Sequence, residues 1–198
     1  MFKWNKTLRD ILIESLLIVF SILLALGVNE WATGRSEDVR AQRALEAVAL
    51  ELAANHEQLV AVLSYHHRLA ASAERADTLG QSRTFAEWRR ALPEFKGFHN
   101  PEFDATAWES ALATGAVAHM PFDTVTALSR VYTYQRKLDD YAATAIPAFD
   151  FSDQAMHATA RRAYIYLETV AANEDSLGQQ YEHALRLLGS LAPRRGLQ

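Results

Sequence analysis

An uninterrupted apolar stretch near the N-terminus constrains the fold of this chain more than any other feature. Residues 11–28 read ILIESLLIVFSILLALGV, and Glu14 is the only charged residue among them. Eighteen helical residues rise about 27 Å, close to the thickness of the hydrocarbon layer of a bilayer. The stretch is flanked by cations and tryptophans of the kind found at membrane surfaces: Lys3, Lys6, Arg9, Trp4 and Trp31. We therefore predict a transmembrane helix over residues 11–31, preceded by a short basic tail over residues 1–10.

Two other interpretations of this stretch exist. A buried core helix could be equally apolar, but such helices rarely carry basic residues and tryptophan on their flanks. A cleavable signal peptide would fit the basic start, and Ala25-Leu26-Gly27 is a tolerable cleavage site. Glu14 within the apolar region and the length of that region argue against cleavage. The prediction is an anchor that stays in the bilayer.

One face of the predicted membrane helix carries small and polar residues, namely Glu14, Ser21, Ala25 and Asn29. Two small side chains four residues apart allow another helix to approach closely, and a carboxyl group could then bond across the pair. We predict a membrane-protein partner on this face. The alternative is that Glu14, one turn inside the bilayer, extends its carboxylate to the interface.

The orientation of the anchor rests on cations near the two ends of the span. Three precede it, and Arg35, Arg40 and Arg43 follow it, so the counts nearly balance. The free amino group tips the balance toward a cytoplasmic N-terminus. The expected location is therefore a single-pass membrane protein with its domain on the outer, periplasmic side.

Composition narrows the classes of function. The chain of 198 residues contains no cysteine, which excludes disulfides, thiolate metal sites and cysteine nucleophiles. Acidic residues outnumber basic ones and no basic run occurs, so nucleic-acid binding is not expected. Glycine and proline are few, which favours helices.

Apolar residues recur at three- and four-residue spacing after a predicted hinge at residues 33–36, where Ser36 could cap a long helix ending near residue 77. Asn55 and His66 interrupt the apolar stripe of that helix and are expected in or near the core. Further helices are predicted over residues 84–92, from an Asp104 cap to Gly115, and from Pro121 to about residue 145.

The last helix is predicted to run unbroken for about 37 residues from a Ser152 cap, since its apolar phase continues through Asn173. No strand pattern or internal repeat appears. The fold prediction is therefore all-α: the membrane helix continues into an irregular antiparallel bundle over residues 36–189, followed by an unpatterned tail over residues 190–198.

An irregular segment between the helices contains three phenylalanines, Phe95, Phe98 and Phe103. Exposed phenylalanine on irregular backbone often marks an interface, so this loop is a second possible partner contact. The alternative is that the three rings close the end of the bundle.

Taken together, these segments resemble a broad group of uncharacterised bacterial single-pass membrane proteins. The likeness lies in ILLALGVNEW at the end of the apolar stretch, in residues 43–55 and in residues 108–132. It covers most of the chain but consists of helical patterns. The resemblance implies membrane attachment and an α-helical domain, and it brings no assigned activity.

A search for chemistry finds no motif. The seven histidines form neither a His-x-x-x-His nor a His-Glu-x-x-His pair, so no metal site is predicted. Nucleophile elbows, phosphate-binding loops and dinucleotide glycine patterns are absent, and no cofactor or catalytic residue is assigned. The predicted function is a non-catalytic accessory or scaffold subunit of a larger membrane complex (respiratory, photosynthetic or transport). The alternative is a membrane-tethered sensor or binding domain, and an enzyme has the least support.

Overall fold

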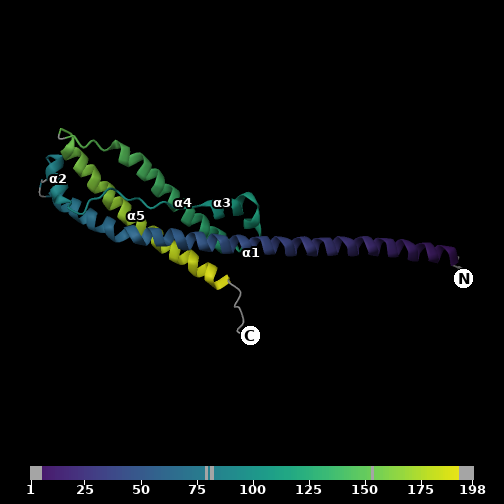
Figure 1. Cartoon of the computed structure of the whole chain (residues 1–198). Helices are drawn as coiled ribbons and strands as arrows, with labels where there is room; N and C mark the ends of the chain where they lie inside the picture. Colours follow the sequence, from purple (N-terminus) through teal and green to yellow (C-terminus); the bar gives the residue numbers. More distant parts are fainter. Residues whose placement is uncertain (1–5, 79, 81–82, 153, 192–198) are drawn as a thin grey trace, which may run out of the picture.

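A computed structural model describes residues 6–78, 80, 83–152 and 154–191 of the chain (Figure 1). Within these residues every element of regular secondary structure is a helix: α1 Lys6–Thr78, α2 Phe85–Ala91, α3 Thr106–Ala113, η1 Ala116–His119, α4 Phe122–Ala145, η2 Ile146–Ala148 and α5 Met156–Leu191. The two η elements are short 3-10 helices. The all-α prediction is therefore confirmed.

The longest element, α1, contains both the apolar stretch and the first bundle helix. Its 73 residues form one α-helix that extends far beyond the bundle (Figure 1). The predicted hinge at residues 33–36 is wrong, and Ser36 lies inside the helix instead of capping it. A single glycine such as Gly34 costs a helix interior only about 1 kcal/mol, too little to break it when helical turns continue on both sides.

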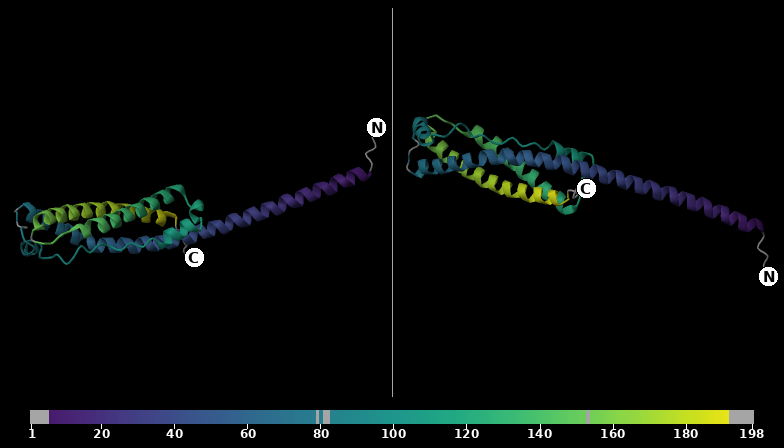
Figure 2. Two further views of the ribbon diagram at one scale, coloured as in Figure 1. Left: turned by 90° about the horizontal axis from the view of Figure 1, so that it is seen from above. Right: turned by 60° about the horizontal axis from the view of Figure 1, so that its bottom comes forward.

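The remaining helices fold back on the second half of α1. His66 of α1 faces Glu174 of α5, and Asp77 faces Arg161, so these two helices run antiparallel. Gly178 faces Leu59 on the same line of contact. α5 also packs along α4, and Figure 2 shows α4 beginning at the end of the bundle where α1 leaves it.

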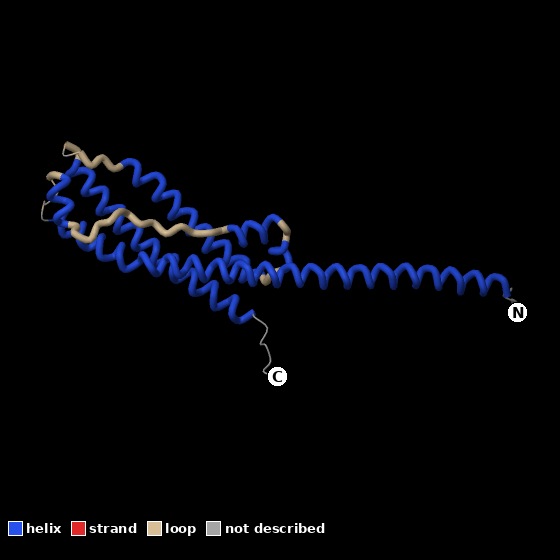
Figure 3. Tube along the Cα trace, in the orientation of Figure 1, coloured by secondary structure: helices blue, strands red, loops and turns tan. Residues whose placement is uncertain are grey.

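An irregular segment, residues 92–105, explains how α4 comes to run in the same direction as α1. It leaves α2 at the far end of the bundle and returns along the helices to α3, as the tan trace in Figure 3 shows. α3 and η1 complete the return, so α4 starts again near the point where α1 enters the bundle. The irregular stretch expected from the sequence is therefore a strap along the bundle and does not lie at one end only.

The ends of the shorter helices show which capping predictions hold. Thr84 accepts a hydrogen bond from the backbone N–H of Glu87, whose side chain accepts one from Thr84 in return, a complete capping box. Pro121 directly precedes α4 as expected. Ser152 does not cap α5, which begins four residues later at Met156.

The start of α3 differs from the prediction in a more informative way. Asp104 accepts from the N–H and hydroxyl of Thr106, one residue earlier than a standard cap. The next free N–H groups, those of Ala107 and Trp108, donate instead to the carboxylate of Glu51 on α1. A distant side chain therefore caps this helix.

Gly178 offers a stability test of the α1–α5 contact. A Cβ added there would lie 3.8 Å from Leu59 Cδ2, an ordinary contact distance. Gly178→Ala should therefore raise the free energy of unfolding by about 0.5–1 kcal/mol, because it reduces the freedom of the unfolded chain without a clash. Chemical denaturation of the chain in detergent measures the change.

Gly115→Ala is the matched control. This residue also has free space around it, but its φ of 72° disfavours any side chain. The control should lower the stability, and equal effects of the two substitutions would contradict the assignment of α5 as one continuous helix at Gly178.

A buried histidine and glutamate as the candidate functional site

The predicted packing face of the apolar helix is accessible along its whole length. Glu14, Ser21, Ala25 and Asn29 are all exposed, and none contacts the bundle. The Ser21 hydroxyl donates to the Leu17 carbonyl 2.7 Å away in its own helix, so it has no need of an external acceptor. This face therefore presents small side chains, and the Ser21 hydroxyl on it is already hydrogen-bonded within the helix. Lys3 and Trp4 lie outside the described residues.

The three phenylalanines of the irregular segment are half-buried and pack against the core. The ring of Phe98 lies 5.1 Å from that of Tyr166, and Phe95 lies 4.9 Å from Trp88, both edge to face. Phe103 lies beside Tyr181. The three rings therefore pack against other aromatic side chains of the same chain, along the bundle and not at one end only.

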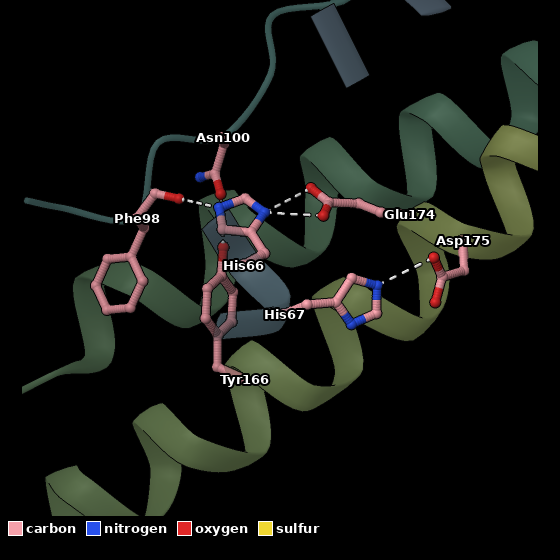
Figure 4. A network of polar contacts seen from close by, with 7 residues as sticks. All are labelled: His66, His67, Phe98, Asn100, Tyr166, Glu174 and Asp175. Atoms are coloured by element: carbon pink, nitrogen blue, oxygen red, sulfur yellow. Dashed lines mark hydrogen bonds and ion pairs between the residues drawn. The ribbon is translucent and has the colours of Figure 1, made fainter. Parts of the chain in front are cut away.

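The most unusual feature of the core is a charged pair, His66 of α1 and Glu174 of α5. Their side chains are 1% and 0% exposed. His66 Nδ1 lies 2.8 and 2.9 Å from the two carboxylate oxygens of Glu174, and Nε2 faces the backbone carbonyl of Phe98 (Figure 4). The imidazole therefore joins three elements: α1, α5 and the irregular segment.

Both ring nitrogens of His66 face acceptors, so each must carry a proton to make its hydrogen bond. Burial alone would lower the pKa of the imidazole. The hydrogen bond and charge of Glu174, together with the Phe98 carbonyl, outweigh that effect and raise the pKa of His66 above 6.5. The geometry therefore describes a buried imidazolium paired with a carboxylate.

Neighbouring groups complete this network. The Tyr166 hydroxyl donates to Asn100 Oδ1 at 2.9 Å, and burial raises the pKa of Tyr166 to about 12. Tyr65 OH donates to the Gly97 carbonyl and accepts from the Lys96 N–H. Each of these bonds ties the irregular segment to α1 or α5.

A second polar cluster lies nearer the apolar end of the bundle and is centred on Glu51. Besides capping α3, this carboxylate accepts a hydrogen bond of 2.6 Å from Tyr132 of α4. Burial and the Glu51 carboxylate raise the pKa of Tyr132, which keeps its hydroxyl protonated as a donor. One side chain of α1 therefore fixes both α3 and α4.

Asn55 extends this second cluster. Its amide donates to the Asp104 carbonyl at 2.6 Å and accepts from the Asp104 N–H at 2.9 Å. Asn55 and His66 are each 1% exposed, so the prediction that both lie in the core is confirmed. Gln135 of α4 bonds the buried hydroxyl of Tyr181 close by.

Sequence reasoning missed Glu51 and Glu174, although a signal for Glu174 was present. Glu174 falls in the same helical phase as Leu167, Val170 and Tyr181, on the buried side of α5. An acidic residue on an apolar stripe indicates a buried partner, and a histidine on the facing helix would have been the natural candidate. Glu51 lies beside the stripe of α1 and has no comparable signal.

The chemistry available to these clusters is that of hydrogen bonding. Every polar atom of His66 and Glu174 already contacts a protein group, so neither presents a free base or ligand. Among the described residues no three His, Asp or Glu side chains come together as a metal site would require. The hydrogen bonds of the two clusters hold the irregular segment and α3 against the long helices.

An open groove of about 690 Å³ lies between the irregular segment and α4. Pro101, Phe103 and Ile146 contribute apolar surface to it, and Asp139 lies on its α4 side. Burial and the neighbouring Asp140 raise the pKa of Asp139. The apolar surface of this groove and the Asp139 carboxyl could together contact a small molecule with an apolar body and a cationic or hydroxyl group.

Comparison of the chain with protein-family models, curated proteins and solved structures gives no match.

His66 and Glu174 have adjacent, exposed counterparts that provide an internal control. His67 pairs with Asp175 at 3.1 Å, and both are about half exposed. Glu174→Gln should lower the free energy of unfolding by roughly 3–5 kcal/mol, since it leaves the imidazolium buried without its partner. Asp175→Asn should cost no more than about 1 kcal/mol.

The pH dependence follows from the raised pKa of His66. Its contribution to stability is complete below the unfolded pKa of about 6.5 and is lost as the pH rises through the higher folded value. Denaturation curves from pH 6 upward should therefore show falling stability, less so in His66→Gln. Equal losses from Glu174→Gln and Asp175→Asn, or unchanged pH dependence in His66→Gln, would contradict the buried ion pair.

Proposed function

We propose that this chain is a single-pass, membrane-anchored accessory or scaffold subunit of a larger membrane complex and has no catalytic role of its own. The observation that carries the proposal is the free apolar section of α1. None of its most apolar stretch is buried by the rest of the chain, and its side chains from Ile11 to Val28 are exposed. Such a surface is stable only when lipid or another protein covers it.

A helix suits this environment because all its backbone groups bond within the segment, as a bilayer requires. The exposed face with Ser21 and Ala25 supports a partner helix, since small side chains allow close backbone contact within lipid. In the bundle that follows, the buried His66–Glu174 pair and the carboxylate of Glu51 are engaged in structural hydrogen bonds. These features favour a role in positioning a partner over a catalytic role. The proposed host is a respiratory, photosynthetic or transport complex.

The groove beside Phe103 supports the alternative, a membrane-tethered sensor or binding domain. Its apolar surface and the Asp139 carboxyl on its α4 side suit a small amphipathic ligand. Purification in mild detergent separates the two functions. A stoichiometric membrane subunit supports the scaffold, whereas a small molecule released from the purified chain on denaturation supports the binding domain.

The packing face makes the scaffold proposal testable by mutation. Ser21→Leu with Ala25→Leu blocks close helix approach while the segment stays apolar. The double variant should remain in carbonate-washed membranes but lose the co-purifying subunit.

A matched control exists on other faces of the same segment. Ser15→Leu with Gly27→Leu changes the composition almost identically, and the space around Gly27 is free. The control should keep the subunit. Loss of the subunit from both variants, or from neither, would reject the proposed face.

The proposed orientation, with a cytoplasmic N-terminus and a periplasmic bundle, can be tested cleanly because the chain contains no cysteine. Ser129→Cys places one thiol on the exposed side of α4. In intact bacterial spheroplasts a membrane-impermeant maleimide should label this variant fully. Labelling that appears only after the membrane is permeabilised would place the bundle in the cytoplasm.

A further inference from the structure

Phe122 is the most exposed large apolar side chain of the bundle, at 81%. It is the first residue of α4 and follows Pro121. Its ring makes no contribution to the core, although other phenylalanines of the bundle pack against it. One exposed apolar ring is common on protein surfaces, but a surface that covered it would gain by removing it from water.

The position of Phe122 in the fold indicates which surface that is. η1, three residues earlier, packs against α1, and His119 Nε2 lies 3.3 Å from the carboxylate of Glu37. Figure 2 shows this end of the bundle at the point where α1 leaves it toward the apolar section. Phe122 therefore lies on the side of the bundle that faces the proposed bilayer.

The direction of α4 adds to this argument. α4 runs away from the apolar section, since Tyr132 contacts Glu51 whereas the earlier His119 contacts Glu37. Side chains in an α-helix tilt toward its N-terminus. The ring of Phe122 is therefore inclined toward the apolar section of α1.

Because α1 is unbroken, the distance along it from the end of the apolar stretch to Glu37 can be calculated from the helical rise. Glu37 lies nine residues beyond Val28, which in a helix corresponds to about 13 Å above the hydrocarbon layer. The headgroup region covers roughly 5–8 Å of this distance. An ordinary tilt of about 20° lowers a point one helix spacing (about 9 Å) to the side of α1 by ~3 Å. The remaining gap is within reach of a phenylalanine side chain.

We infer that Phe122 is an interfacial contact that rests on the lipid headgroups beside the anchor and so fixes the tilt of the bundle over the membrane. Leu112 at the end of α3 and Val39 of α1 are also exposed at this end, and Arg35 supplies a cation for lipid phosphate. Asp123, next to Phe122, keeps the turn polar and limits the contact to the headgroup layer. This inference rests on the proposed membrane anchoring.

Single thiols in the cysteine-free chain provide the test. Three variants, Phe122→Cys, Leu50→Cys and Ser21→Cys, are labelled with a polarity-sensitive fluorophore and placed in phosphatidylcholine vesicles. Leu50 is the matched control, since it is 75% exposed on α1 but 22 residues beyond Val28. Ser21 reports the anchor itself. Equal melting temperatures of the three variants and the parent chain establish that the fold is intact.

The expected result is a blue-shifted emission at Phe122→Cys that is quenched by lipids with a spin label near the headgroup. Ser21→Cys should be quenched by spin labels deep in the acyl chains, and Leu50→Cys by neither. If Ser21→Cys is quenched but Phe122→Cys is not, the interfacial contact is refuted and the anchor stands. A shielded but unquenched Phe122→Cys indicates a protein contact and also refutes the inference. No quenching at Ser21→Cys would refute the proposed anchoring itself.

Discussion

The continuity of α1 is the constraint on which the rest of the structure depends. One helix of 73 residues supplies an entirely exposed apolar section and, beyond it, the stripe on which the bundle packs. Because no hinge separates the two sections, every contact made by the bundle also orients the apolar section. A continuous helix therefore holds the apolar section and the bundle in one relative orientation.

The irregular segment determines where charge is buried. The irregular segment, residues 92–105, has no helical hydrogen bonds to pair its backbone carbonyl groups. Those carbonyl groups that are buried therefore need donors from side chains in the core. His66 supplies a donor to the Phe98 carbonyl, and its second N–H then requires an acceptor, which Glu174 provides. A buried ion pair is rarely better for stability than an apolar pair of equal size. Its value here is that it fixes the path of a segment that has no regular structure.

Prediction from sequence succeeded where helical periodicity was strong and failed where long-range polar contacts decide the geometry. The long helices, the irregular segment and the burial of Asn55 and His66 follow from the apolar phase. The hinge prediction at residues 33–36 failed because one glycine is a weak breaker within a long helix. The partners of the buried polar residues were not predictable, since Glu174 is 108 residues from His66, and backbone acceptors such as the Phe98 carbonyl carry no sequence signal.

The two polar clusters also explain how a bundle of this size can serve as a rigid support. Glu51 joins α1 to α3 and α4 near the apolar end, and His66 joins α1 to α5 and the strap farther out. Rotation of α3, α4 or α5 about α1 would break a hydrogen bond at one of these two levels, at a cost of about 1–3 kcal/mol for each buried group left unpaired. A partner that binds one face of the apolar section therefore also fixes the direction in which the groove and the strap face. In the proposed scaffold role, this coupling would convert a contact inside the membrane into a defined position outside it.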